Sequence, residues 1–294
     1  MGTLYVVATP IGNLSDLSPR ALEVLRSCDL ILAEDTRHSK RLLQHYDIHV
    51  PLVSYHKFNE RSRAEEVLQR LVSEAIAVAL ISDAGTPCIS DPGTEIVRRA
   101  RELGIPVYGV SGPSAVATAI SVSGLPAREF TFLGFLPRKA GELKEVLRSI
   151  RERRISTFVV YESPRRIHQL ARALLEEFPQ AQACFCCELT KVHERAYWGP
   201  IAEVVRQLEA DPNAGYGEYT VVVHVEHDPP AAPAPPAAGE LSLEARLVQV
   251  MVERGCSLKE AVAAVAREQG VPRREVYQAS LRLRALVAGQ EEEG

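Results

Sequence analysis

The stretch Leu80–Pro92 reads Leu-Ile-Ser-Asp-Ala-Gly-Thr-Pro-Cys-Ile-Ser-Asp-Pro, and Gly93 follows it. An apolar run from Ile76 to Ile81 leads into this stretch and ends abruptly at the Asp, Gly, Thr and Pro residues. Buried parallel strands have such continuous apolar runs, and in open α/β sheets the loops after the strands form the ligand crevice. Taken alone, the stretch is equally typical of a tight surface turn.

Three further apolar segments end in the same way. They are Leu4–Ala8 before Thr9-Pro10-Ile11-Gly12-Asn13, Cys28–Ala33 before Glu34-Asp35-Thr36-Arg37, and Pro106–Val110 before Ser111-Gly112-Pro113-Ser114. Each is followed by a helical pattern, and this alternation predicts an α/β fold with a mostly parallel sheet covered on both faces. The loops are expected to share one crevice, but any doubly wound protein would have them, so they do not identify the ligand.

The composition of the chain limits the class of protein to which it can belong. With 294 residues, of which 46% are hydrophobic, the chain can bury a substantial core and is expected to hold two or more domains. The one CxxC spacing among its six cysteines, Cys184 to Cys187, lies in an apolar, strand-like run, which favours free thiols in a reducing compartment over a metal site. No apolar stretch reaches the roughly 18 residues that span a bilayer. We therefore expect a cytoplasmic protein with no membrane partner and no bound metal.

Changes of composition and hydrophobic pattern along the chain predict four parts. An N-terminal α/β domain covers residues 1–122, and a second α/β domain covers 123–227. Residues 228–240 are rich in Pro and Ala and read as an extended linker. Residues 241–290 carry three apolar stripes at helical spacing, which predicts a small helical module of the size of a helix-turn-helix unit.

Two groups of basic residues suggest a polyanionic partner, although the net charge of the chain is -4. The helical module carries Arg273, Arg274, Arg282 and Arg284, and the second domain has a basic run that begins with Arg138 and Lys139. Clustered Arg and Lys side chains suit phosphate binding. Solvated helix faces have a similar composition, so this pattern alone leaves nucleic-acid binding open.

Together the loops resemble the tetrapyrrole-methylase superfamily of S-adenosylmethionine enzymes. The resemblance rests on Thr9–Leu14, Ala33–Arg37, Ser82–Pro87, Ser90–Gly93 and Ser111–Ser114. Within the superfamily, three more motifs resemble the branch that methylates a cytidine ribose 2′-hydroxyl in the decoding region of small-subunit (16S) ribosomal RNA: Tyr161–Arg166, Glu188–Glu194 and Gly217–Thr220. The helical module also resembles that branch.

This resemblance implies two α/β domains with S-adenosylmethionine in the cleft between them, a homodimer, and small-subunit ribosomal RNA or the assembled subunit as partner. It places ten residues at the cofactor: Pro10, Ile11, Gly12, Asp83, Ala84, Gly85, Pro87, Ser111, Gly112 and Ser114. The RNA-binding residues are then Arg138, Lys139, Arg165, Arg273, Arg274, Arg282 and Arg284. For Arg165, a structural role in fixing a loop across the cleft is the alternative.

A ribose hydroxyl is a weak nucleophile, so a nearby base would assist its methylation. Glu34, Asp35 and Glu60 are the candidates for that base, and Arg37 is expected to hold an adjacent phosphate. Asp35 and Thr36 also fit ordinary capping at the start of a helix.

Three other functions remain open. One is a methyltransferase of the same fold that acts on a tetrapyrrole or another small molecule. The second is a non-catalytic RNA-binding protein of ribosome assembly. The third is a dinucleotide enzyme, against which the absence of any GxGxxG motif argues.

Overall fold

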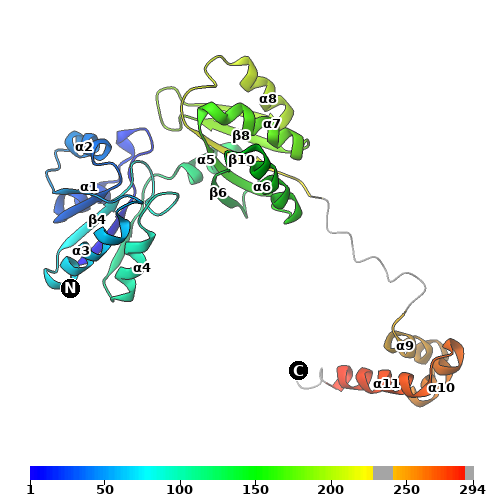
Figure 1. Cartoon of the computed structure of the whole chain (residues 1–294). Helices are drawn as coiled ribbons and strands as arrows, with labels where there is room; N and C mark the ends of the chain where they lie inside the picture. The colour runs from blue at the N-terminus through cyan, green and yellow to red at the C-terminus, as the bar shows by residue number, and fades with distance from the viewer. Residues whose placement is uncertain (228–240, 289–294) are drawn as a thin grey trace. The chain divides into compact units, whose positions relative to one another are not determined.

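The computed structural model describes residues 1–227 and 241–288, with side chains to residue 283 in the second range. The chain divides into two compact units, Met1–His227 and Asp228–Gly294 (Figure 1). The predicted linker at 228–240 and the last two residues of the predicted module, 289 and 290, lie outside the described residues.

The first unit begins with a five-stranded sheet in the order β3-β2-β4-β1-β5, whose neighbouring strands are all parallel. Its strands are β1 (Thr3–Val7), β2 (Leu30–Ala33), β3 (Leu52–Ser54), β4 (Ala77–Ile81) and β5 (Val107–Val110). The register pairs Ala33 with Ile81, and Val7 with Val110. The carboxyl ends of these strands therefore meet at one edge of the sheet, as the sequence predicted.

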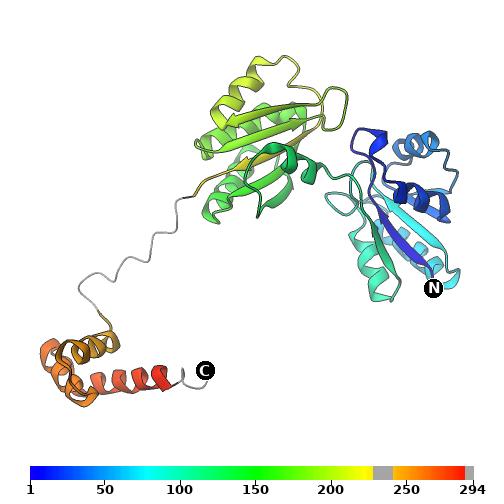
Figure 2. The same cartoon turned by 180° about the vertical axis from the view of Figure 1, so that it is seen from behind.

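Helices cover both faces of this sheet (Figure 2). They are α1 (Pro19–Ser27), α2 (Thr36–His45), α3 (Glu60–Ser73) and α4 (Thr94–Glu102); the short η1 (Leu14–Asp16) precedes α1 and has no buried residue. Alternate residues of one strand pack in opposite directions: Leu80 lies in the cluster with α3 and α4, and Ile81 lies in the cluster with α1 and α2. Burial on both faces explains why the inner strands β2 and β4 are apolar throughout.

The second sheet is mixed, in the order β6-β7-β10-β8-β9. Its strands are β6 (Thr131–Phe135), β7 (Thr157–Glu162), β8 (Gln182–Cys187), β9 (Arg195–Pro200) and β10 (Tyr219–His224). Only β6 and β7 run parallel; β10 is antiparallel to β7 and β8, and β9 is antiparallel to β8. The carboxyl end of β8 thereby lies beside the amino end of β10, where Cys187 pairs with Tyr219.

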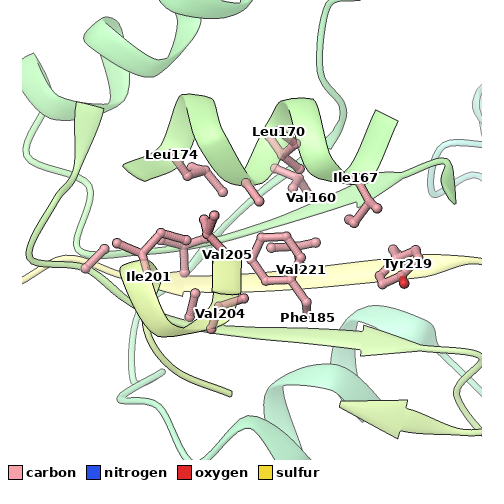
Figure 3. Packing of buried hydrophobic residues seen from close by; sticks show 14 of the residues in the cluster. Val160, Ile167, Leu170, Leu174, Phe185, Ile201, Val204, Val205, Tyr219 and Val221 are labelled. Carbon is pink, nitrogen blue, oxygen red and sulfur yellow. The ribbon is translucent and has the colours of Figure 1, made fainter. Parts of the chain in front are cut away.

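One face of the second sheet is covered by η2 (Pro164–Arg166), α6 (Ala140–Glu152), α7 (Ile167–Glu177) and α8 (Ile201–Ala210). Figure 3 shows Ile167, Leu170 and Leu174 of α7 above the strand residues Val160, Phe185 and Val221. The opposite face packs against α5 (Ala115–Ser123), through Val116 and Ala119. Helix α5 precedes the predicted domain boundary at residue 122, yet it packs against the second sheet.

The second unit contains α9 (Leu243–Arg254), α10 (Leu258–Gln269) and α11 (Arg273–Ala288). Their apolar stripes form one buried cluster, which includes Leu247, Val262 and Val276. Gly255 and Gly270 end the first two helices in the left-handed conformation, with φ of +58° and +65°. The predicted α/β class with a C-terminal helical module is confirmed.

Candidate active site

A cavity of about 560 Å³ lies in the first unit where loops of both sheets meet. Residues of the first sheet's loops and of α5 form one side of it: Ile11, Glu34, Asp83, Ala84, Gly85, Thr86, Ile89, Ser90, Asp91, Ser114 and Ala115. Residues of the second sheet and its loops form the other: Phe135, Tyr161, Glu162, Ser163, Pro164, Glu188, Leu189, Lys191, Glu218, Tyr219 and Thr220. Its volume falls in the range of small-molecule binding sites, about 300–1,000 Å³.

Hydrogen bonds tie together the loops that follow β1, β4 and β5. Thr9 and Gly85 exchange two backbone hydrogen bonds, with N–O distances of 2.9 and 3.0 Å. The hydroxyl of Thr86 donates to the carbonyl oxygen of Pro113 at 3.2 Å. Gly85 has a φ of +81°, a conformation that an L side chain rarely adopts. These bonds make the first-domain side of the cavity a connected backbone scaffold.

Five of the ten predicted cofactor residues line this cavity: Ile11, Asp83, Ala84, Gly85 and Ser114. The other five, Pro10, Gly12, Pro87, Ser111 and Gly112, do not. Two of these, Gly12 and Gly112, are glycines in closely packed positions. A Cβ on Gly12 would lie 2.4 Å from Cγ of Lys191, and one on Gly112 would lie 3.1 Å from Cβ of Ala8.

Among the predicted catalytic residues, only Glu34 lines the cavity. Asp35 caps α2, because its carboxylate accepts from the backbone N–H of Arg37 at 2.8 Å. The same carboxylate also pairs with the Arg37 guanidinium, which holds the pKa of Asp35 below its usual value. The capping alternative for Asp35 is thus confirmed by its geometry.

Glu60 supports the loop from behind. Its Oε1 accepts from the backbone N–H of Gly93 at 3.0 Å and from the hydroxyl of Tyr55 at 3.3 Å. Gly93 is the last residue of the loop that holds Asp91, and Tyr55 is fully buried. Glu60 therefore connects the cavity loop to the core of the first sheet.

Three carboxylates gather on the first-domain side: Glu34, Asp83 and Asp91. Burial raises the pKa of Asp91 to about 6, and the neighbouring charges of Glu34 and Asp83 add to the effect. Burial and Asp83 also raise the pKa of Glu34. Asp83 is held in place by the backbone N–H of Asp35, which donates to its Oδ1 at 3.0 Å. Such crowding of partly buried carboxylates is common at catalytic sites.

The second-domain side is fixed by its own ion pairs. Glu162, at the end of β7, is buried and pairs with Arg166 at 2.8 Å. Lys191 bridges Glu188 and Glu218 at 2.8 Å each. The ammonium of Lys191 thereby ties the loop after β8 to the residue that precedes β10.

Sequence reasoning did not place several lining residues at the cavity. Ser90 and Asp91 belong to a motif that carried the family resemblance, and Tyr161, Glu162, Glu188 and Glu218 belong to others, so those motifs were the available signal. Thr86 also lay within one. Ile89 lay within the stretch Leu80–Pro92 that was expected to border the crevice, although no motif included it, and nothing in the sequence marked Phe135.

The predicted RNA-binding residues are spread over both units. Arg138, Lys139 and Arg165 are exposed near the ends of β6 and β7, and Lys139 pairs with Glu142. In the helical module, Arg273 and Arg274 are exposed at the start of α11, whereas Arg282 pairs with Glu244 of α9 at 2.7 Å. The side chain of Arg284 lies outside the described residues.

Metal clusters and membrane-spanning helices are absent from the part of the chain that the structure describes. No group of three or more His, Cys, Asp or Glu side chains there is placed to hold a metal ion. None of the helices described is both long and apolar enough to cross a membrane. All six cysteines are free thiols.

Comparison with known proteins places the chain. Residues 3–205 match the family of Tetrapyrrole (Corrin/Porphyrin) Methylases, and residues 239–284 match the RsmI C-terminal HTH domain. A ribosomal RNA small subunit methyltransferase I of Xylella fastidiosa is 41% identical over 94% of this chain and 98% of its own length. The protein of the same name from Pseudomonas aeruginosa is 42% identical over 95% of this chain and 97% of its own.

The fold has solved counterparts. The uroporphyrin-III C-methyltransferase of Thermus thermophilus, in complex with S-adenosylhomocysteine, matches with a TM-score of 0.51 and 20% identity. The match covers 76% of this chain and 97% of that one, and at this identity it shows the fold alone. The full-length similarity to the curated relatives is what decides the family: this chain belongs to the tetrapyrrole methylases, and within them to the ribosomal RNA small subunit methyltransferase I family.

Proposed function

We propose that this chain transfers a methyl group from S-adenosylmethionine to the 2′-hydroxyl of a cytidine in the decoding region of small-subunit (16S) ribosomal RNA. The observation that carries the proposal is the cavity itself. It joins half of the predicted cofactor residues to a group of carboxylates, in a chain whose relatives share the name ribosomal RNA small subunit methyltransferase I over nearly their full length.

The residues present fit this cofactor. Gly85 and Ile11 pack closely on one wall of the cavity, since a Cβ on Gly85 would lie 3.3 Å from Cγ2 of Ile11. Ile11, Ala84, Gly85 and Ser114 offer backbone groups and small surfaces, and Leu189 and Tyr161 offer apolar surface. Asp83 and Glu34 give the cavity a negative charge that suits a sulfonium cation. S-adenosylmethionine, when bound, supplies an activated methyl group.

We propose that Asp91 or Glu34 is the base that accepts the proton of the ribose hydroxyl. Both line the cavity, and a pKa of about 6 leaves Asp91 mostly ionised at neutral pH yet basic enough to accept a proton. Asp35 and Glu60 act as positioning residues in this proposal, because Asp35 orients Asp83 and Glu60 holds the loop that carries Asp91. Arg37, whose side chain is exposed beside Asp35, is the residue we propose to hold an adjacent phosphate.

The wider setting is also proposed. We infer a homodimer, a cytoplasmic location and recognition of the small subunit or its RNA, with support from the family and from exposed arginines such as Arg273 and Arg274. Light scattering of the full chain at micromolar concentration tests the dimer. A monomeric mass would remove it.

The experiment for the function is methyl transfer by the full-length protein from radiolabelled S-adenosylmethionine. The acceptors are naked small-subunit ribosomal RNA, assembled small subunits and a tetrapyrrole, with large-subunit RNA as control. We expect label in small-subunit RNA only. Label in the tetrapyrrole would favour the small-molecule alternative, and cofactor binding without any transfer would favour a non-catalytic assembly protein.

A further inference from the structure

Two large apolar side chains are exposed beside the carboxylates of the cavity. Ile89, in the loop after β4, is 41% exposed, and Phe135, at the end of β6, is 66% exposed. Both line the cavity, one from each side. An exposed apolar surface within a functional site usually marks a place where a ligand binds and covers that surface.

The backbone of β6 aims Phe135 at this place. The pairing of β6 with β7 shifts register between Phe132 and Gly134, and Gly134 has a φ of +64°. In a regular strand, residues 132 and 135 would point to opposite faces. The irregularity instead brings both rings against Tyr161, at centroid distances of 5.0 Å for Phe132 and 5.5 Å for Phe135. Phe135 is thus held from behind while much of its ring stays free.

The same irregularity at Gly134 brings β6 beside the loop that carries Asp91. A Cβ on Gly134 would lie 3.3 Å from the hydroxyl oxygen of Ser90, which is flanked by Ile89 and Asp91. Asp91 is also close enough to Tyr161 for its charge to raise the pKa of that phenol, with burial as the larger cause. The apolar pair and Asp91 therefore occupy one corner of the cavity.

We propose that Phe135, opposed by Ile89, is the stacking surface for the nucleobase of the nucleotide that is methylated. This deepens the proposed function and rests on it. In a nucleotide, the base and the 2′-hydroxyl sit on adjacent ribose carbons, so a surface that holds the base must lie next to the group that takes the hydroxyl proton. Proteins that recognise unpaired RNA nucleotides commonly stack the bases on aromatic side chains.

The test compares Phe135→Ala and Phe135→Tyr with wild type in the full-length protein. The substrate is an RNA hairpin that carries the target cytidine, and Tyr108→Ala is the control, because Tyr108 is 52% exposed and does not line the cavity. Loss of base stacking predicts a rise in KM for RNA of about 5- to 150-fold for Phe135→Ala. Phe135→Tyr should have a KM for RNA close to that of wild type, and Tyr108→Ala should leave the wild-type KM unchanged.

A second hairpin identifies the group that stacks. It carries an abasic ribonucleotide, which keeps the 2′-hydroxyl, in place of the cytidine. If Phe135 stacks on this base, removing the base raises KM for wild type but has no further effect on Phe135→Ala. Additive losses would mean that Phe135 contacts another part of the RNA and would overturn the inference.

Binding of S-adenosylhomocysteine, measured by calorimetry, separates the remaining outcomes. We expect the same affinity for wild type and Phe135→Ala. A matching loss of this affinity would assign Phe135 to the cofactor and overturn the inference. An active wild type with an unchanged Phe135→Ala would overturn it while the proposed function stands, and a wild type that methylates no RNA would remove both.

Discussion

Asp91 lies where a carboxylate is costly to ionise. Its pKa rises from 3.8 to about 6 because it is partly buried and because the charges of Glu34 and Asp83 act on it. A carboxyl group whose pKa is higher in the folded than in the unfolded state holds its proton more tightly in the folded state. Its ionisation therefore reduces stability as pH rises from about 4 to about 6, and the cost stays constant above that.

We expect Asp91→Asn to melt at a higher temperature than wild type at pH 7.5, by several degrees, since each kcal/mol moves Tm by about 2–4 °C in a protein of this size. At pH 4.5 the gain should be smaller, because Asp91 is then mostly protonated in the folded state. Calorimetric scans of wild type and Asp91→Asn at both pH values test this. An equal shift at both would show that ionisation of Asp91 carries no folding cost.

At the scale of elements, Gly12, in the loop after β1, packs closely against the loop after β8. A Cβ on Gly12 would lie 2.4 Å from Cγ of Lys191 and 3.0 Å from the backbone oxygen of Leu189. Lys191 is held by two carboxylates, so it cannot move without breaking those pairs. This contact joins the loops of the two sheets beside the cavity.

We predict that Gly12→Ala lowers the free energy of unfolding by about 1–3 kcal/mol through overpacking. Gly141→Ala in α6 is the matched control, because a Cβ there meets no atom within 4 Å and alanine favours a helix by about 0.5–1 kcal/mol. Urea denaturation measures both. A Gly12→Ala protein as stable as wild type would show that the two loops separate easily.

The arginines of the helical module differ in what surrounds them. Arg273 and Arg274 have no ion-pair partner among the described residues, whereas Arg282 pairs with Glu244. Replacing Arg273 or Arg274 by Gln should weaken RNA binding and flatten its log–log salt dependence by roughly 0.7–0.9 per phosphate contact. Arg282→Gln should have a smaller effect. Filter binding at several salt concentrations tests this, and equal effects would show that RNA displaces Glu244.

The first sheet and its part of the cavity could be predicted from sequence because parallel strands end at one edge. Once Leu80 and Ile81 indicated a buried strand, Asp83 to Gly85 had to lie near Ile11 and Ser114. Strand β3 was not predicted, because three residues give too short a pattern. Strand β9 was missed because its alternating exposed residues interrupt the apolar run.

The second-domain side of the cavity depends on strand order, which local sequence does not specify. Glu188 follows β8 and Glu218 precedes β10, so the two meet only because these strands are antiparallel neighbours. Phe135 depends on the irregular pairing at Gly134. The resemblance placed Gly12 at the cofactor, which stays a prediction, whereas its close packing against Lys191 and Leu189 depends on contacts between two loops that local sequence does not specify.

On the scale of the whole molecule, the chain divides after His227 into one unit that holds the cavity and another that holds the helical module. Every residue that lines the cavity belongs to the first unit. Removing residues 229–294 should therefore leave the affinity for S-adenosylhomocysteine unchanged and weaken RNA binding. Calorimetry and filter binding on the truncated and full chains test this. A truncated chain with unchanged RNA affinity and salt slope would assign the module another role, such as dimer contacts.

The central claim concerns which atom receives the methyl group. The most direct measurement is mass spectrometry of nucleosides from small-subunit ribosomal RNA after incubation with the full-length protein and isotopically labelled S-adenosylmethionine. The account predicts labelled 2′-O-methylcytidine from one position in the decoding region. Label on a base, or no label in either naked RNA or assembled subunits while the cofactor still binds, would contradict it.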